Sequence, residues 1–559
     1  MKKIYLIVFS LFLVATSTIA QEQKEKKKTQ QGHTDQNKFR QLKDVLATPN
    51  DQHTASGAPG HQYSQQKVDY VMDIRLDEAA NKIYGSEDIT YYNNSKDNLA
   101  YLWVQLDQNM RADDSQTPLA KSNSAAAFIS TDNFKSEYMG EGKGFGFNIE
   151  SVTKDGKPLS HFINRTMMRI NLPKALAPGE SFDFSIVWNY KINDINKDGG
   201  RSGLESFKDG NNNYTIAQFF PRLAVYNNVE GWQNMQFWGR SEFALEFGDY
   251  EVNLTVPSDH IVEATGTLQN EKEVLTRTQR KRFEQARKSF DNPVVIVTQE
   301  EAEKNEKGRA TATKTWKFKA QRVRDFAFAS SRKYIWDAMA VDINGKTVMA
   351  TSLYPKEGNP LWEEHSTRAV ATTLIEYSKL TFDYPYAKAV SVHSERQGME
   401  YPMICFNFGR PNPDGTYSDR TKKGMIGVIV HEVGHNFFPM IVNSDERQWT
   451  WMDEGLNSFV EILAEDVYDA ELFASNPAKD ITRYMGGDQS NISPIMSQGD
   501  YVKQFGPNAY TKPAAGLYIL RKTIMGPELF DHAFRTYAQR WMFKHPTPED
   551  FFRSMEDAS

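Results

Sequence analysis

The period of the hydrophobic pattern changes along the chain, and this change constrains the fold more than any other feature. Runs of alternating apolar and polar residues dominate the first half, and turns such as Ala177-Pro178-Gly179 separate them. The runs lie at 68–76, 83–92, 182–190 and 250–256. A period of two is typical of strands that bury one face. The sequence therefore predicts an all-β, sandwich-like domain in this half.

The pattern becomes helical in the second half. Strand-like sequence returns at 315–318 and 326–330, and long helical patterns begin after about Met349, first over 362–380. The strand-like runs complete the β-domain, and the helical patterns predict a helix-rich domain after it. We therefore expect the chain to change its fold class once.

The predicted organisation has four parts. At roughly 150 residues per domain, 559 residues suffice for about three to four domains. A charged helical stretch at about 270–307 favours an exposed insertion over a nucleic-acid patch. The parts are a signal peptide at 1–20, a flexible linker at 21–65, a β-domain at 66–338 that includes the insertion, and a helix-rich domain at 339–559.

The N-terminus indicates export. Lys2 and Lys3 precede an apolar run at 4–14 and the small-residue pattern Thr18-Ile19-Ala20, which is typical of a signal peptide cut after Ala20. The run is about half of the roughly 20 apolar residues that a spanning helix needs. We therefore expect a periplasmic or secreted protein with no transmembrane anchor after cleavage.

Composition excludes several classes of protein. The net charge is only −6, from 66 basic and 72 acidic residues, so nothing in it favours a nucleic-acid partner. Cys405 is the single cysteine, which rules out an internal disulfide and a thiolate metal cluster. Any metal site must therefore use histidines and carboxylates.

The pentapeptide His431-Glu432-Val433-Gly434-His435 carries the strongest chemical information. In a helix the two histidines lie one turn apart on the same face, so both imidazoles can reach one metal ion. Apolar residues surround the motif over 425–438, which predicts a buried helix.

A catalytic zinc site needs a third protein ligand and an open position for water. Glu454 follows His435 after eighteen residues and opens an apparent second helix. This distance allows the chain to turn and bring the second helix back to the first. Two imidazoles and one carboxylate suit Zn²⁺ better than Mg²⁺ or Ca²⁺, so His431, His435 and Glu454 are the predicted zinc ligands.

This spacing resembles the gluzincin pattern of the M1 family of zinc aminopeptidases. Two further segments are similar to motifs of that family and occur in the same order. Gln397-Gly398-Met399-Glu400-Tyr401-Pro402 resembles its Gly-x-Met-Glu-Asn exopeptidase motif, and Tyr510-Thr511-Lys512-Pro513-Ala514-Ala515 resembles its Tyr-x-Lys-Gly-Ala segment. The β-domain segment Gln218-Phe219-Phe220-Pro221-Arg222 also falls in family-like order. The resemblance implies a thermolysin-like α/β (α+β) zinc peptidase domain after the β-domain.

The resemblance also implies a role for each residue. Glu432 is the general base, and Tyr510 stabilises the oxyanion. Glu400 binds the free α-amine of a peptide, which limits cleavage to the first bond. Gly398, Met399 and Gln218 contribute to substrate binding. The expected substrates are therefore peptides with a free N-terminus, while the oligomeric state is not determined by the sequence.

Three positions depart from the family pattern. Tyr401 stands where Asn is common, Pro513 where Gly is common, and Asp453 where Asn usually precedes the ligand glutamate. None of these changes removes a predicted catalytic group. Relatives continue with further helices, so we also expect that the natural chain extends past Ser559 into an additional helical region.

The β-domain contains the pattern of a second metal site. Asp194, Asn196, Asp198 and Glu205 occupy positions one, three, five and twelve of a calcium-loop pattern, with Gly199 at position six. The preceding residues have a strand pattern, however, and no helix clearly follows. A polar hairpin loop without Ca²⁺ is the alternative that we favour.

Two other functions remain open at this point. A thermolysin-like endopeptidase would share the zinc ligands but would not need Glu400. An inactive peptide-binding homologue would usually lack the general base or a zinc ligand, and here both are present.

Overall fold

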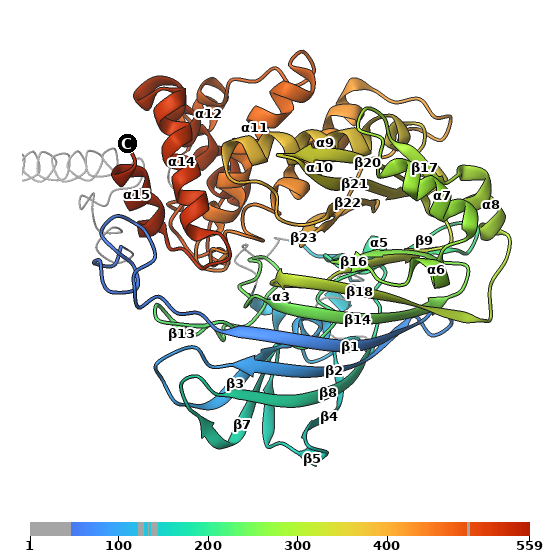
Figure 1. The fold of residues 1–559 in the computed structure, drawn as a ribbon, viewed down its shortest axis with the longest axis horizontal. Coiled ribbons are helices and arrows are strands. Elements are labelled where there is room, and N and C mark those ends of the chain that lie inside the picture. The colour runs from blue at the N-terminus through green and yellow to red at the C-terminus, as the bar shows by residue number, and fades with distance from the viewer. Residues whose placement is uncertain (1–45, 121–127, 132–133, 136–142, 489–491) are drawn as a thin grey trace, which may run out of the picture.

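The computed structural model describes residues 46–120, 128–131, 134–135, 143–488 and 492–559. They form a β-rich N-terminal part and a helix-rich C-terminal part, and the ribbon of Figure 1 shows the two packed side by side. This order agrees with the predicted fold class. The predicted signal peptide, and residues 21–45 of the predicted linker, lie outside the described residues.

An eight-stranded sheet is the largest element of the β-domain, in the order β16-β18-β14-β1-β2-β8-β4-β5. β1 pairs with β14 in parallel, and the other neighbours are antiparallel. Burial alternates along β1 because its apolar residues recur at every second position, as the sequence pattern predicts. The bounds are β1 Lys67–Asp77, β2 Lys82–Tyr92, β4 Asn148–Lys154, β5 Lys157–Pro158, β8 Ser181–Lys191, β14 Gly248–Pro257, β16 Thr267–Leu268 and β18 Thr313–Val323.

Smaller sheets complete this part. Two have four strands each, in the orders β15-β19-β10-β9 and β11-β3-β7-β6, and β12 pairs with β13. The bounds are β3 Leu99–Gln105, β6 His161–Asn164, β7 Met167–Leu176, β9 Gly203–Ser206, β10 Asn212–Ile216, β11 Arg222–Leu223, β12 Tyr226–Asn227, β13 Gly231–Trp232, β15 Ile261–Ala264 and β19 Phe328–Ser331. Short helical segments in this part are η1 Asp107–Arg111, α3 Thr117–Ala120 and α5 Ile195–Asp198.

A six-stranded sheet opens the C-terminal part, in the order β17-β20-β21-β22-β24-β23. The long helices α9 and α10 pack against it, and β23 forms one edge. The bounds are β17 Val294–Val297, β20 Ile335–Ile343, β21 Lys346–Tyr354, β22 Lys388–His393, β23 Gly398–Tyr401, β24 Ile404–Asn407, α9 Leu361–Leu380 and α10 Asp419–Gly434, with η2 Lys356–Gly358 before α9.

The charged insertion differs from the prediction. It contains α6 Glu271–Val274, α7 Arg277–Ala286 and α8 Gln299–Glu306, but also β17, which pairs with β20. The segment therefore adds an edge strand to the second sheet. β20 spans the domain boundary predicted between residues 338 and 339, so the second sheet begins earlier in the chain. The paired residues of β17 and β20 are more than 35 positions apart in the chain. A local sequence pattern does not reveal such pairing, so the sequence did not predict the edge strand.

Helices dominate the remainder of the chain. They are α11 Leu456–Asp469, α12 Pro477–Met485, α13 Lys512–Ile519, α14 Pro527–Trp541 and α15 Pro548–Asp557. Three π-helical turns adjoin them, at η3 Trp451–Gly455, η4 Gly506–Thr511 and η5 Leu520–Met525. Among the described residues, no helix is long and apolar enough to cross a membrane.

Residues 46–65 are not the flexible linker that their composition predicts. This segment runs beside α15 in Figure 1. His53 Nδ1 lies 2.8 Å from Asp550 Oδ2 and its ring stacks on Trp541 at 5.5 Å, while Trp541 Nε1 donates to the Gly57 carbonyl at 2.7 Å. Residues near the C-terminal end of the chain hold this segment in place. The composition of the segment itself contains no information about these contacts.

Candidate zinc centre

Helix α10 carries the first two predicted ligands. Ser418 caps its start by accepting a hydrogen bond from Thr421 N. The helix ends at Gly434, and His435 keeps the helical spacing because its N–H donates to His431 O at 3.1 Å. A side chain at Gly434 would meet Tyr377 Oη at 2.3 Å, so glycine allows α9 to approach. The two imidazoles therefore project from one face of a closely packed helix.

The third predicted ligand comes from the π-helical turn η3, directly before α11. Glu454 is buried there, and π turns occur frequently at functional sites. The next residue, Gly455, permits a close approach, since a Cβ at this position would lie 2.5 Å from Pro513 Cγ. Pro513, a departure from the family pattern, therefore packs against the backbone beside the ligand.

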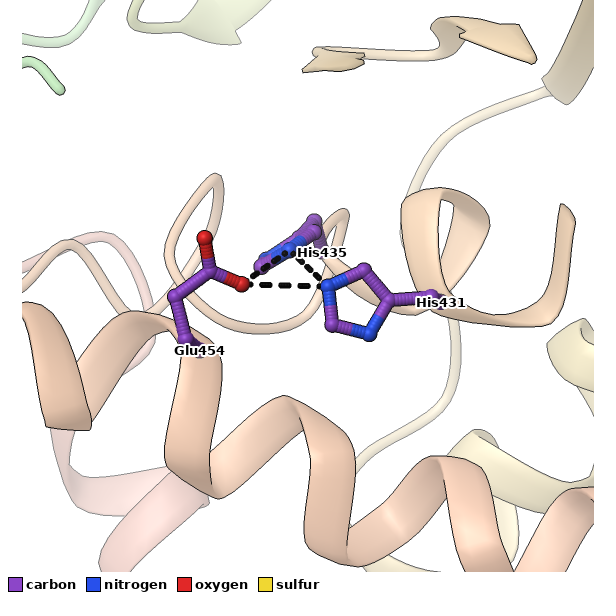
Figure 2. Close-up of side chains that lie close together, drawn as sticks. All are labelled: His431, His435 and Glu454. Carbon is purple, nitrogen blue, oxygen red and sulfur yellow. Dashed lines mark hydrogen bonds and ion pairs between the residues drawn. The ribbon is translucent and has the colours of Figure 1, made fainter. Parts of the chain in front are cut away.

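The three side chains point at one another in Figure 2. His431 Nε2 lies 3.0 Å from both Glu454 Oε2 and His435 Nε2, and His435 Nε2 lies 3.3 Å from Glu454 Oε2. Tetrahedral zinc with ligand bonds of about 2.0–2.1 Å separates its ligand atoms by about 3.4 Å. The donor set and its spacing therefore fit a zinc ion.

Outer partners fix both imidazole rings. His431 Nδ1 lies 2.8 Å from Glu461 Oε2, while His435 Nδ1 lies 2.8 Å from the Phe438 carbonyl and 3.1 Å from Asp453 Oδ1. With Nδ1 as the donor, the Nε2 lone pair of each ring faces the centre. The sequence did not identify Glu461 as a partner. Its place seven residues after Glu454, two helical turns along, was the available indication.

Glu432 and Glu400 lie on the side of the centre that faces strand β23. Ligand-type atoms of Glu400, Glu432 and His435 lie within 4.8 Å of one another. Burial, and next the negative charge of Glu400, raise the pKa of the Glu432 carboxyl well above its ordinary value. Gly398 makes room for this carboxylate, because a Cβ there would lie 2.8 Å from Glu432 Oε1.

Tyr510 lies against the third ligand. It belongs to the π turn η4, and its hydroxyl donates to Glu454 Oε1 at 2.5 Å. Its ring stacks on His431 with centroids 5.6 Å apart. The structure therefore brings Tyr510 together with the predicted ligands, although 56 residues separate it from Glu454.

Of the remaining predicted substrate residues, Met399 lies on β23, and Gln218 lies between β10 and β11 and contacts that strand. Met399 is buried, and Arg201 Nη1 lies 3.1 Å from its sulfur. Gln218 does not point freely toward the centre, because its Nε2 donates to Tyr401 Oη at 2.9 Å. Tyr401, which stands where the family commonly has Asn, thus provides a hydrogen-bond partner for Gln218.

Two further buried carboxylates near the centre belong to no motif that the sequence shows. Glu242 and Glu446 are buried and offer oxygen atoms within 4.8 Å of those of Glu400 and Asp453. Glu242 comes from a loop of the β-domain that precedes β14. No family-like motif surrounds either residue, so only the tertiary structure brings them to the site.

The Asp194 loop is not arranged as the calcium site that its pattern allowed. Asp194 pairs with Lys197 at 2.7 Å and Asp198 with Lys143 at 2.8 Å. Asn196 donates to Glu395 at 2.9 Å, and Glu205 pairs with Arg410. Since the protein's own side chains engage all four residues, the polar-loop alternative describes the segment better.

These features define a class: a β-domain followed by a gluzincin-type metallopeptidase domain with a His, His, Glu donor set. Residues 363–559 match the model of the peptidase family M1 domain. The M1 zinc metallopeptidase from Deinococcus radiodurans has a similar fold, with a TM-score of 0.56 at 12% identity over 90% of this chain and 93% of that chain. A mutant M1 zinc metallopeptidase from the same organism, bound to a Tyr-Ser-Ala substrate, gives a TM-score of 0.55 at 12% identity, over 90% of this chain and 96% of that one.

Curated relatives match shorter stretches. Aminopeptidase M1-A of Oryza sativa subsp. japonica is 22% identical over 219 residues, which are 37% of this chain and 25% of that protein. Leukotriene A-4 hydrolase of Xenopus laevis is 25% identical over 163 residues, which are 28% of this chain and 26% of that protein. The matched region thus spans about a quarter of the length of either relative.

Proposed function

We propose that the protein is an exported zinc-dependent aminopeptidase that removes N-terminal residues from peptides. One observation carries this proposal: Glu400, on an edge strand, lies within 4.8 Å of Glu432 and His435, and its Oε1 atom has no hydrogen-bond partner among the described residues. A buried carboxylate without a donor is costly unless a cation binds it. A substrate α-ammonium is such a cation.

The three ligands would hold the metal through His431 Nε2, His435 Nε2 and a Glu454 carboxylate oxygen. Zinc bound there supplies a Lewis acid that polarises the scissile carbonyl and lowers the pKa of a water molecule.

Glu432 would accept the proton of the attacking water and transfer it to the leaving amine. Its position supports this role, because it projects from the ligand helix and the missing side chain at Gly398 leaves room for its Oε1 atom. Water adds to the carbonyl carbon, the peptide C–N bond breaks, and the proton leaves with the amine nitrogen.

Tyr510 would donate a hydrogen bond to the carbonyl oxygen as negative charge develops there. The hydroxyl donates to Glu454 Oε1 at 2.5 Å, so a substrate oxygen beside this ligand lies within its reach. A positioned donor of this kind contributes roughly 3 kcal/mol to transition-state binding.

Peptide substrates are supported by the bound Tyr-Ser-Ala of the similar Deinococcus radiodurans structure. The N-terminal sequence supports export, through Lys2, Lys3 and the apolar run at 4–14. Fractionation of cells that express the full chain tests this part. A protein that is found in the cytoplasm and still carries residues 1–20 would contradict export.

Blocking the α-amine tests the aminopeptidase activity itself. The zinc-loaded protein should release the first residue from a free peptide but not from its N-acetylated form, because acetylation removes the charge that Glu400 would bind. Equal cleavage of both forms would instead support a thermolysin-like endopeptidase. Absence of cleavage with zinc bound would support a peptide-binding homologue.

A further inference from the structure

A second group of buried carboxylates lies beside the predicted zinc ligands. One oxygen each from Glu242, Glu400, Glu446 and Asp453 can be chosen so that all four atoms lie within 4.8 Å of one another. These residues come from three regions, namely the β-domain loop before β14, strand β23 and the segment before α11. We call this group the carboxylate pocket.

Several oxygen atoms of the carboxylate pocket lack a donor. Glu242 Oε2, Glu400 Oε1 and Asp453 Oδ2 are buried and have no hydrogen-bond partner among the described residues. Glu400 as a whole is only 3% exposed. Acceptors that are buried together without a donor are expected where a cation binds, since their desolvation is otherwise uncompensated.

The charges of the carboxylate pocket do not balance. Arg201 pairs with Glu242 and Arg324 pairs with Glu446, so two of the four negative charges are compensated by the chain. His435 Nδ1 lies 3.1 Å from Asp453 Oδ1 but is a neutral donor when Nε2 binds a metal. Glu400 and Asp453 have no arginine or lysine partner among the described residues, so these two carboxyl groups are left for a cation to bind.

The geometry agrees with the charge. A hard divalent cation binds oxygen at about 2.0–2.6 Å, so that even ligands on opposite sides lie only about 4.0–5.2 Å apart. The oxygen atoms of the carboxylate pocket fall within this limit. The donor set is oxygen only, which favours cations of the Mg²⁺ and Mn²⁺ type over zinc.

We propose that the carboxylate pocket is a second cation site, which takes one oxygen-preferring divalent ion and competes with the substrate's α-ammonium for Glu400. The competition rests on the proposed function, whereas the binding itself does not. Millimolar divalent ion should therefore raise KM for an aminoacyl substrate and leave kcat unchanged.

Binding of Mn²⁺ to the zinc-loaded full chain tests the site directly. Electron paramagnetic resonance should detect one bound Mn²⁺ per chain with the zinc content unchanged, and L-leucinamide should displace it. No bound Mn²⁺ at millimolar concentration, or binding only as zinc is lost, would overturn the proposal.

A pair of variants locates the ion. Glu242→Gln should weaken Mn²⁺ binding at least about tenfold with zinc retained. Glu205→Gln is the matched control, because Glu205 is also a buried β-domain glutamate paired with an arginine, Arg410, and it lies outside the carboxylate pocket. Equal weakening in both variants, or in neither, would contradict the assignment.

Anomalous scattering from crystals of the unaltered chain soaked in Mn²⁺ requires no variant to fold. A peak among the four carboxylates supports the proposal, and a peak elsewhere alone rejects it. A protein that binds Mn²⁺ there but cleaves no peptide would reject only the proposed function. An active aminopeptidase that binds no Mn²⁺ would reject only this inference.

Discussion

Individual residues at the zinc centre differ in how firmly they are held. Both oxygens of Glu454 have partners, since Oε2 lies near the imidazoles of His431 and His435 and Oε1 accepts from Tyr510. Glu432 Oε2, by contrast, has no hydrogen-bond partner among the described residues. A fixed carboxylate suits a metal ligand, and a less constrained one suits proton transfer.

Replacing Glu432 tests this division. Glu432→Gln keeps the shape but removes the proton acceptor, so kcat should fall about 10²–10⁴-fold. The zinc content should stay at one ion per chain, because Glu432 is outside the ligand set. Turnover of an aminoacyl substrate and metal analysis check both parts, and a variant with wild-type kcat would refute the role.

Gly398 offers a second test at this scale. In Gly398→Ala the new methyl group would lie 2.8 Å from Glu432 Oε1 and 3.0 Å from Val428 Cγ2, which must displace the carboxylate. We expect kcat to fall at least about tenfold with zinc retained. Gly424→Ala in α10 is the control, since no atom lies within 4 Å of its Cβ and activity should persist. Equal activities of the two variants would contradict the contact.

Among the elements, the contact between η3 and α13 sets the distance between Glu454 and Tyr510. It depends on Gly455, whose added Cβ would meet Pro513 Cγ at 2.5 Å and Ala509 O at 3.0 Å. The helix cannot move away without also moving the π turn that carries Tyr510. Pro513 and Gly455 therefore act as one packing unit.

A double-mutant cycle tests the packing unit. Gly455→Ala should destabilise the protein by about 1–3 kcal/mol through overpacking, and it should lower kcat. The cost should be smaller in a Pro513→Gly background, which removes the nearest contact, although that change alone costs about 1 kcal/mol because glycine gives the unfolded chain more conformational freedom than proline. Thermal unfolding of all four proteins measures the coupling. Additive effects would show that the two residues do not share the contact.

At the scale of the whole molecule, buried polar groups join the six-stranded sheet to its helices. Asp337 on β20 is 1% exposed and accepts hydrogen bonds from Tyr354 Oη, at 2.6 Å, and from Thr367 Oγ1 on α9. Burial raises the pKa of the Asp337 carboxyl to about 7, although these two hydrogen bonds lower it in part. The folded protein therefore holds this carboxyl protonated at mildly acidic pH.

Stability should decrease as pH rises because of this group. Between about pH 4 and pH 7 the folded state binds a proton that the unfolded state has lost, so the free energy of unfolding falls with rising pH. A pKa about three units above the ordinary value corresponds to a loss on the order of 4 kcal/mol. Asp337→Asn should remove this part of the pH dependence in denaturant unfolding from pH 5 to 8. Identical pH profiles for the two proteins would contradict it.

Much of the fold and of the candidate site follows from local pattern. Alternating hydrophobicity located β1, β2, β8 and β14, and the spacing of His431, His435 and Glu454 identified a donor set that the structure brings together. Strand and helix periods, and side chains one helical turn apart, are properties of short segments, so a local pattern can carry them.

Other features were decided only by tertiary structure. The sequence by itself determined the order of the two parts, the ligand helix and the resemblance to family motifs. It did not determine that β17 joins the second sheet, that residues 46–65 pack on α14 and α15, or that Glu242 and Glu446 reach Glu400. Each of these features depends on contacts between residues far apart in the chain. The hydrophobic period of a short segment contains no information about the free energy of such contacts. For the same reason the Asp194 loop matched a calcium pattern, while Lys143, Lys197, Glu395 and Arg410 already satisfy its side chains in the folded protein.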